Sequence, residues 1–299
     1  MSTRPEDRDP GRSATALPIR AITFDFGNTL VPVTRAALGG VVEALADAVT
    51  VRLAVDRAAF LVAWTEERDR QLRMDVPAYR ELDLALRLVR VLARLRGMEP
   101  PPPDDAWDDT AARGRSEPAE IDWAVGVYSG AFVAGLPPDP TVGALLGRLA
   151  SGYRLGILSN WPLAATIDRY VEAAGWAPHL AAVVVSQRIG VIKPHVAIFR
   201  AAEAALAAGR GDRGAGAVGP GASDGFDGPL EPASILHVGD DPVADVAGAR
   251  AAGWRAALVR SRPSDSPLPG STPDGLVDAN LVLDRLADLE PALARLERG

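Results

Sequence analysis

Short apolar runs alternate along this chain with segments of helical periodicity, and this alternation most constrains what the chain can fold into. The apolar runs are 19–26, 154–158, 182–185, 235–238, 255–259 and 281–283. The helical segments between the later runs are 141–150, 164–174, 195–208 and 243–252. Nearly continuous apolar strands separated by helices are typical of a parallel sheet that is covered on both faces. The sequence therefore predicts an α/β fold with a doubly wound parallel sheet.

The region 34–136 interrupts this alternation. It has helical periodicity and no good strand pattern, Asp56 can cap one of its helices, and Pro77 can open another that runs to Gly97. We therefore predict a helical domain at 34–136, inserted into an α/β core formed by 19–33 and 137–299.

Two further segments have the composition of irregular chain. Residues 1–18 are charged and proline-rich and lack the apolar centre of a secretory signal, so we expect a disordered N-terminal tail and a cytoplasmic protein. Residues 209–230 are rich in glycine and have no periodicity, which predicts a flexible surface loop. A phosphate-binding glycine loop is the competing interpretation, but the order of residues that it requires is missing.

The composition excludes several kinds of function. The chain has no cysteine, which excludes disulfides, thiolate metal sites and cysteine nucleophiles. A net charge of −7 gives no general attraction to nucleic acid or to anionic membranes. No apolar run approaches the ~18 residues that a membrane-spanning helix needs. We therefore expect a small-molecule substrate and neither nucleic acid nor membrane as a partner.

Polar residues stand where four of the apolar runs end, and ligands of open parallel sheets bind outside the carboxyl ends of the strands. These residues are Asp25, Ser159, Asn160, Lys193, Asp240, Asp241 and Asp245. Of the 32 lysine and arginine residues, only Lys193 is a lysine, which makes its position notable. Several carboxylates in one pocket cannot all stay ionised without a cation. Mg²⁺, a hard cation that prefers oxygen ligands, suits such a site.

In order along the chain, these residues form D-x-x-x-T, S-N, K-P and G-D-D-x-x-x-D, each after an apolar run. This order resembles the four motifs of the haloacid dehalogenase superfamily, and the resemblance extends from about residue 19 to residue 290. It implies a Rossmann-like core, hydrolase activity, and a C1-type helical cap, as in subfamily I, at 34–136.

The resemblance also implies roles for single residues in a phosphatase reaction. Asp25 would attack phosphorus and form an aspartyl-phosphate that water then hydrolyses. Ser159 would hold phosphoryl oxygens, and Lys193 would neutralise the nucleophile and the transferring group. Asp241 or Asp245 would orient Lys193 and water. The Mg²⁺ ligands would come from Asp25, Gly27 (through its carbonyl), Asp240, Asp241 and Asp245.

Further contacts with substrate or phosphate are expected around the first two motifs. The candidates are Gly27, Asn28, Thr29, Asn160 and Trp161. Asn28 tolerates the left-handed conformation that such a turn can require. Trp161 follows the Ser-Asn pair, so it either packs against the cap or stacks on substrate. The sequence favours a core histidine at His237, and no pair of histidines has the spacing of a zinc site.

Gly27 is the main departure from the motifs of phosphatases in this superfamily. They usually carry a second Asp at this position, which protonates the leaving oxygen. General acid–base catalysis is typically worth ~10²–10⁴ in rate, so its loss favours acyl or aryl phosphates. Three interpretations remain: a Mg²⁺-dependent phosphatase of a small phosphorylated metabolite, a 2-haloacid dehalogenase, or a degenerate binding or regulatory protein. The branch of the superfamily that hydrolyses phosphonates is excluded, because it needs a lysine in the cap and the only lysine here, Lys193, belongs to the third motif. Monomer and homodimer both remain open.

Overall fold

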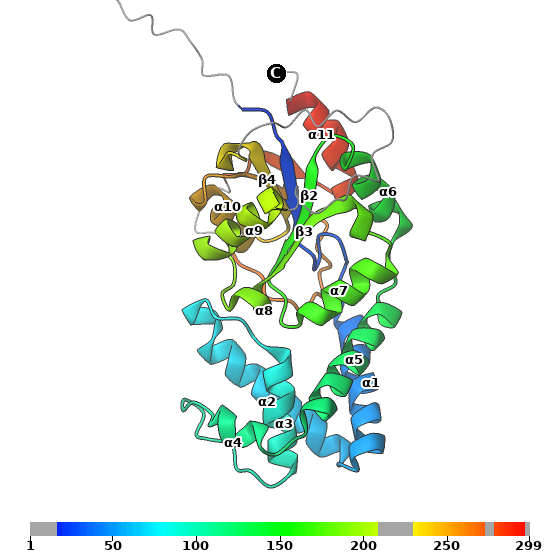
Figure 1. Cartoon of the computed structure of the whole chain (residues 1–299), viewed down its shortest axis with the longest axis vertical. Helices are drawn as coiled ribbons and strands as arrows, with labels where there is room; N and C mark the ends of the chain where they lie inside the picture. Colours follow the sequence, from blue (N-terminus) through cyan, green and yellow to red (C-terminus); the bar gives the residue numbers. More distant parts are fainter. Residues whose placement is uncertain (1–16, 209–229, 273–277, 297–299) are drawn as a thin grey trace, which may run out of the picture.

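The computed structural model describes residues 17–208, 230–272 and 278–296. Its centre is a six-stranded parallel sheet with the strand order β3-β2-β1-β4-β5-β6 (Figure 1). The strands are β1 (Ala21–Phe24), β2 (Arg154–Ser159), β3 (Leu180–Val185), β4 (Ile235–Gly239), β5 (Arg255–Val259) and β6 (Leu281–Leu283). The predicted doubly wound parallel sheet is therefore confirmed.

Strand β1 lies at the point where the strand order reverses, between β2 and β4. Such a reversal opens a crevice outside the carboxyl ends of the strands. Phe24, the last residue of β1, is paired with Ile157 of β2 and Val238 of β4, so the three strands end close together. The residues that directly follow these strands are thereby brought to one place.

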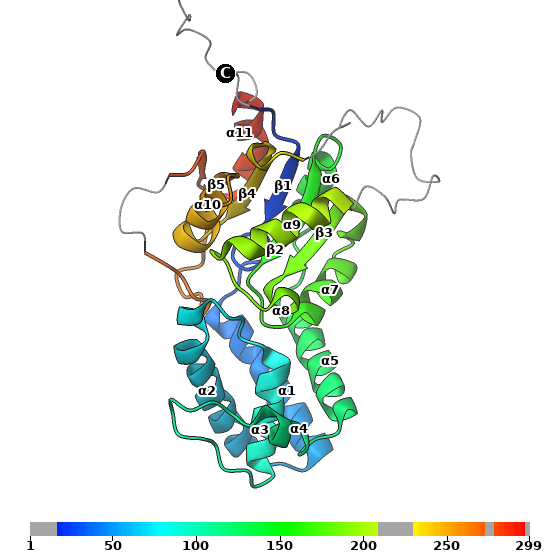
Figure 2. The ribbon, with the colours of Figure 1, turned by 60° about the vertical axis from the view of Figure 1, so that its left-hand side comes forward.

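Helices cover the sheet on both faces (Figure 2). One face is covered by α6 (Pro140–Leu149), α7 (Ala164–Ala173) and α11 (Leu289–Leu296), and the other by α9 (Val196–Ala208) and α10 (Gly248–Ala251). Successive side chains of a strand point to opposite faces. Ile22 and Phe24 accordingly belong to the first apolar cluster and Ala21 to the second, and all four residues of β1 are buried.

Shorter elements connect these helices and strands. They are η2 (Ala177–His179), α8 (Ser186–Ile189), η3 (Pro232–Ser234), the π-helical turn η4 (Pro242–Ala247) and η5 (Leu286–Asp288). Gly175 and Gly253, which end α7 and α10, have φ angles of 68° and 83°. Glycine is favoured at these helix ends because it adopts the left-handed conformation without steric cost.

The chain between β1 and α6 is helical and forms a separate group below the sheet in Figure 1. Its elements are α1 (Arg35–Leu53), α2 (Arg57–Met74), η1 (Val76–Ala78), α3 (Leu84–Leu95), α4 (Asp109–Arg113) and α5 (Pro118–Gly135). The Thr34 side chain caps α1 by accepting from Ala37 N at 3.2 Å, and Asp56 caps α2 by accepting from Ala59 N at 2.7 Å. Such caps satisfy N–H groups that have no partner within the helix.

The helix predicted to open at Pro77 begins instead at Leu84, so that start was wrong. Pro77 lies in the short turn η1, and Arg80 forms an antiparallel bridge with Val191 beside the sheet. Asp83 then caps α3 by accepting from Leu86 N at 3.0 Å. Proline is tolerated in the first turn of a helix but does not specify one. The pairing with residues about 110 positions later is a tertiary contact that local sequence signals do not contain.

Two sequence predictions concern residues that lie mostly outside the described ranges. They are the N-terminal tail at 1–18, of which only 17 and 18 are described, and the glycine-rich loop at 209–230, of which only 230 is described. Among the residues that the structure describes, no helix has both the length and the apolar character needed to cross a membrane.

Candidate active site

Segments far apart in the sequence meet at the carboxyl ends of β1, β2 and β4. Asp25 directly follows β1, Ser159 is the last residue of β2, and Asp240 directly follows β4. The Ser159 hydroxyl donates a hydrogen bond to Asp25 Oδ1 over 3.0 Å. Asp25 is 8% exposed and Ser159 is fully buried, so this carboxylate is held in a site with little access to water.

Lys193, the only lysine, connects two of the carboxylates. Its ammonium group donates to Asp25 Oδ1 at 2.8 Å, to Asp245 Oδ1 at 2.6 Å and to the Leu158 carbonyl at 2.9 Å. The Asn160 amide clamps the Lys193 backbone from both sides, because its Oδ1 accepts from Lys193 N and its Nδ2 donates to Lys193 O. Lys193 is therefore fixed between two acids by three donated bonds and a backbone clamp.

Burial and charge act on these groups in opposite directions. Burial raises the pKa of Asp25 to about 6, against the opposing charge of Lys193. Burial also raises the pKa of Asp240 to about 7, together with the charges of Asp25 and Asp245. For Asp245 burial is outweighed by Lys193 and by the hydrogen bond with His237, which hold its pKa below the ordinary value. Asp245 is therefore ionised at neutral pH, whereas Asp25 and Asp240 ionise only near neutral pH, and a further cation would favour their ionised forms.

Three carboxyl groups converge closely enough to hold such a cation. Asp25, Asp240 and Asp245 each offer an oxygen, and these oxygens lie within 4.8 Å of one another. Buried carboxylates of this kind are oxygen ligands that hard divalent cations prefer. The donor set and its charge therefore fit Mg²⁺, and all three residues were among the metal ligands predicted from the sequence.

The loop after Asp25 has a shape set by close contacts. Asn28 adopts the left-handed conformation with a φ of 61°, as expected for Asn in this turn, and its side chain accepts from Val33 N at 3.2 Å. A Cβ at Gly27 would lie 2.5 Å from Leu268 Cδ1 and 3.1 Å from Trp161 Cζ3, so any larger residue there would have to displace the end of the Leu268 side chain. Thr29 Oγ1 donates to Asp240 Oδ1 over 3.4 Å and thus joins the first and last motifs.

Trp161 is placed by packing. It is 2% exposed and lies edge-on to Phe26 and Phe132, with ring centroids 5.3 and 5.2 Å away. The predicted contact with the cap is thus formed through Phe132 of α5. Its indole N–H is buried and meets no acceptor among the described residues.

Asp241 lies outside the acidic cluster of Asp25, Asp240 and Asp245, and its role as a metal ligand stays a prediction. Its Oδ1 accepts from the backbone N–H groups of Val243 and Ala244 at 2.9 and 2.8 Å and caps η4. Its Oδ2 accepts from Ser271 N at 2.7 Å. With both oxygens engaged in this way, Asp241 positions the chain around the site instead of facing the nucleophile.

His237 is a site neighbour whose contacts the sequence did not indicate. It is fully buried, as predicted for a core histidine, and its Nδ1 lies 2.8 Å from Thr23 Oγ1. Its Nε2 lies 3.1 Å from Asp245 Oδ1 and 3.5 Å from Lys193 Nζ. Burial lowers the pKa of His237, with the positive charge of Lys193 acting in the same direction. The imidazole is therefore neutral and fixes the side chain of Asp245.

The segment 262–271, which we call the strap, also contacts the site and was not predicted from the sequence. Arg262 Nη1 donates to Asp240 Oδ2 at 3.1 Å, and Ser266 Oγ donates to Asn28 Oδ1 at 3.1 Å. Leu268 contacts Gly27, and Ser271 bonds Asp241. The strap therefore touches both the first and the last motif. Its sequence has no periodicity or motif that could have identified these contacts.

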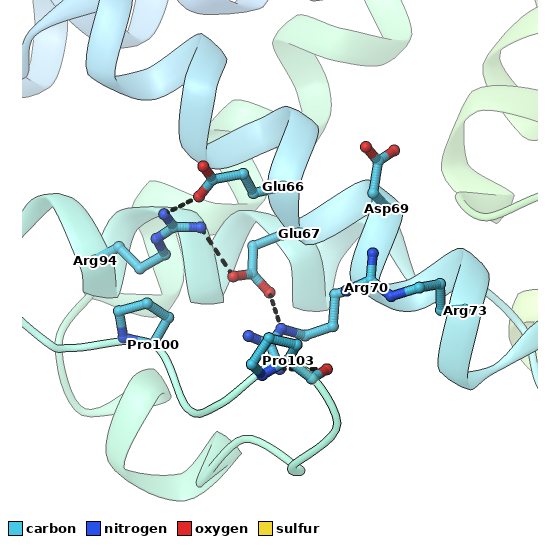
Figure 3. A pocket seen from close by; sticks show the side chains of 8 residues that line it. All are labelled: Glu66, Glu67, Asp69, Arg70, Arg73, Arg94, Pro100 and Pro103. Atoms are coloured by element: carbon cyan, nitrogen blue, oxygen red, sulfur yellow. Dashed lines mark hydrogen bonds and ion pairs between the residues drawn. The ribbon is translucent and has the colours of Figure 1, made fainter.

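Two cavities lie away from these residues. One, of about 250 Å³, lies between α2 and the prolines that follow α3 (Figure 3). Most of its charges are paired, because Arg94 contacts Glu66 and Glu67, and Arg70 contacts Glu67. Arg70 also donates to the carbonyls of the proline run, which makes this a structural network. The other cavity, of about 410 Å³, lies between α6 and α7.

Removal of the charge at Asp240 is expected to stabilise the cation-free protein at alkaline pH. The folded-state pKa of Asp240 is raised, so its ionised form costs stability, and this cost grows from pH 4 to about pH 7. We expect Asp240→Asn to raise the free energy of unfolding by about 2 kcal/mol at pH 8 in EDTA, with little gain at pH 4.5. Urea unfolding at both pH values measures this.

The exposed Asp284→Asn substitution is the matched control and should leave stability unchanged at both pH values, because the Asp284 side chain is 88% exposed. Equal or lower stability of Asp240→Asn at pH 8 would contradict the electrostatic description of the site.

The sequence matches the family described as "Hydrolase: haloacid dehalogenase-like hydrolase" over residues 19–253. No curated protein sequence matches the chain. Among solved structures, a 2-haloacid dehalogenase from Pseudomonas syringae pv. Tomato is similar with a TM-score of 0.61 and 23% identity, over 93% of this chain and 99% of that chain.

Two other similar structures carry different descriptions. A HAD phosphatase from Thermococcus onnurineus has a TM-score of 0.52 and 18% identity, over 92% of this chain and 98% of its own. A HAD-hydrolase from Bacillus subtilis bound to magnesium has a TM-score of 0.51 and 15% identity, over 93% of this chain and 100% of its own. At these identities the likeness shows a shared fold, and the reaction must be argued from the site.

Proposed function

The chain belongs to the haloacid dehalogenase-like hydrolases, and we propose that it is a Mg²⁺-dependent phosphatase of small phosphorylated metabolites. The observation that carries the proposal is the convergence of Asp25, Asp240 and Asp245, whose oxygens lie within 4.8 Å of one another. Two of these carboxyls have pKa values raised toward neutrality, so the site favours an added cation. A bound Mg²⁺ would offset the charge of the carboxylates and of a phosphoryl group.

Asp25 is the nucleophile in this proposal. Ser159 and Lys193 both donate to its Oδ1, which leaves Oδ2 to attack phosphorus. The phosphorus–oxygen bond to the leaving group breaks as the bond to Asp25 forms, and water then hydrolyses the aspartyl-phosphate. Lys193 offsets negative charge on the nucleophile, and Asp245 with His237 holds its ammonium group in place.

The surroundings of Gly27 restrict the leaving group. The atoms nearest to a Cβ placed at Gly27 are carbon atoms of Leu268 and Trp161. These carbons cannot donate a proton to a leaving group. A leaving oxygen of high pKa would therefore depart without general acid assistance. Because that assistance is typically worth ~10²–10⁴ in rate, acyl and aryl phosphates are the favoured substrate classes.

The same observation favours one second candidate, which is dehalogenation of 2-haloacids. A halide leaves without a proton, so an apolar contact at Gly27 is no obstacle to that reaction. Asp25 would attack carbon instead of phosphorus and displace the halide. This reaction would not use the acidic cluster as a cation site, so the two candidates differ in their need for a metal.

Metal dependence and leaving-group preference test the proposal together. We expect phosphate release from acetyl phosphate and p-nitrophenyl phosphate with Mg²⁺, and none with EDTA. We expect glycerol 3-phosphate, which has an alkoxide leaving group, to react at least ~100-fold more slowly. Initial rates of phosphate release measure both effects.

The alternatives give different results in the same assays. Halide release from 2-chloropropionate in EDTA would support the dehalogenase candidate and overturn the phosphatase. Absence of both phosphate and halide release would support a binding or regulatory protein, the third interpretation of the sequence.

A further inference from the structure

Arg262 contacts a carboxylate of the acidic cluster. Its Nη1 donates to Asp240 Oδ2 at 3.1 Å, and the same guanidinium donates to the carbonyls of Leu268 and Pro269 within the strap. The Asp240 side chain is 4% exposed and that of Arg262 is 25% exposed, so the pair is largely shielded from water. The carbonyl contacts fix the guanidinium, and its place beside Asp240 does not depend on the ion pair alone.

The position of this guanidinium conflicts with occupation of the cluster by a divalent cation. Asp240 is one of the three residues whose oxygens converge within 4.8 Å. A cation among these oxygens would lie a few ångströms from the guanidinium, in a site where water screens charge poorly. Repulsion between the divalent cation and the Arg262 guanidinium would then disfavour binding of both at the Asp240 carboxylate at the same time.

We propose that Arg262 is an internal competitor of the metal: its guanidinium occupies the Asp240 carboxylate in the cation-free protein and leaves it when Mg²⁺ binds. This rests on the proposed function, since it takes Asp240 as a ligand of Mg²⁺. A protein that must first vacate its site binds with its intrinsic affinity multiplied by the fraction of molecules whose site is vacant.

Displacement of Arg262 would also release the strap. The guanidinium holds the carbonyls of Leu268 and Pro269, and Leu268 packs against Gly27 in the loop that follows the nucleophile. When Arg262 leaves Asp240, the attached segment moves with it and uncovers the Gly27 side of the site. Metal binding and access to the nucleophile are thereby coupled.

Calorimetric titration of MgCl₂ into the full chain without substrate measures the competition. We expect Arg262→Gln to bind Mg²⁺ about tenfold more tightly than the unmodified chain, as for a competitor that is bound nine-tenths of the time. Arg260→Gln is the matched control, because it removes the same charge only two residues from Arg262. The Arg260 side chain is 65% exposed. We expect its affinity to stay within about twofold of the unmodified chain.

A second variant separates competition from net charge. Leu268→Ala keeps every charge but removes the packing that holds the strap against Gly27. We expect it also to bind Mg²⁺ more tightly, by about threefold. Hydrogen exchange should show that Mg²⁺ speeds exchange in 263–271 of the unmodified chain, whereas these amides exchange fast in Arg262→Gln even without Mg²⁺.

The outcomes distinguish this proposal from the proposed function. Mg²⁺ binding by the unmodified chain, with equal or weaker binding by Arg262→Gln, would overturn the competition and leave the phosphatase proposal standing. An equal gain in affinity for Arg260→Gln would reduce the effect to net charge and also overturn it. Absence of Mg²⁺ binding in every chain would overturn both proposals.

Discussion

Asp25→Asn is expected to lower the rate of acetyl phosphate hydrolysis by about 10⁴-fold or more, because the amide cannot attack phosphorus. The substitution keeps the size of the side chain and its oxygen can still accept from Ser159 and Lys193, which donate to Asp25 Oδ1 at 3.0 and 2.8 Å. The loss should therefore appear in the rate of phosphate release with little change in the fold. The exposed Asp284→Asn variant should keep full activity.

A stability measurement separates loss of the nucleophile from loss of structure. The folded-state pKa of Asp25 is raised to about 6, so its ionised form costs stability above that pH, and asparagine removes this cost. Asp25→Asn should therefore melt at an equal or higher temperature than the unmodified chain at pH 8 in EDTA. An active Asp25→Asn variant would exclude Asp25 as the nucleophile in either proposed reaction.

Lys193→Met is expected to lower both activity and stability, because Lys193 is the buried cation that pairs with Asp25 and Asp245. Removal of one partner from a buried ion pair typically costs ~3–5 kcal/mol, since the remaining charge stays uncompensated. The loss should be larger at pH 8 than at pH 5, because the carboxyls can take up protons as the pH falls. Urea unfolding at the two pH values measures the difference.

Two comparisons sharpen the Lys193 experiment. Arg260→Met removes an exposed cation and should change stability by less than ~0.5 kcal/mol. Lys193→Arg keeps the charge but places a larger, planar guanidinium group where a compact ammonium group is bound. Compared with Lys193→Met, it should therefore restore part of the stability and little activity. Full stability of Lys193→Met at pH 8 would show that the buried pair does not hold the motifs together.

The general architecture of this protein was predictable from its sequence because the signals are local. Apolar runs such as 235–238 and the caps Asp56 and Gly175 act over a few residues, and each is readable without knowledge of the fold. The motifs were identifiable because they follow such runs in a fixed order along the chain. A parallel sheet then brings Asp25, Ser159 and Asp240 together at one edge.

The finer assignment of side chains within the site was not readable in this way. Asp240 and Asp241 are adjacent in sequence and chemically identical, yet only Asp240 joins the acidic cluster. Asp241 turns instead to cap η4 and to bind Ser271, 30 positions later. Which carboxylate faces the nucleophile depends on the path of the backbone after β4, and both paths are compatible with the same local pattern.

The sequence by itself thus determined the sheet, its helices, the family and the residues that gather at the strand ends, because periodicity and motif order are properties of the chain. Only the tertiary structure decided that Arg262 lies on Asp240, that Leu268 fills the space beside Gly27, and that α3 begins at Leu84 and not at Pro77. The first two contacts join residues that are 22 and 241 positions apart, and Arg262 and Leu268 both lie in a segment without regular secondary structure. Their energy comes from shape and charge complementarity that exists only after the chain has folded.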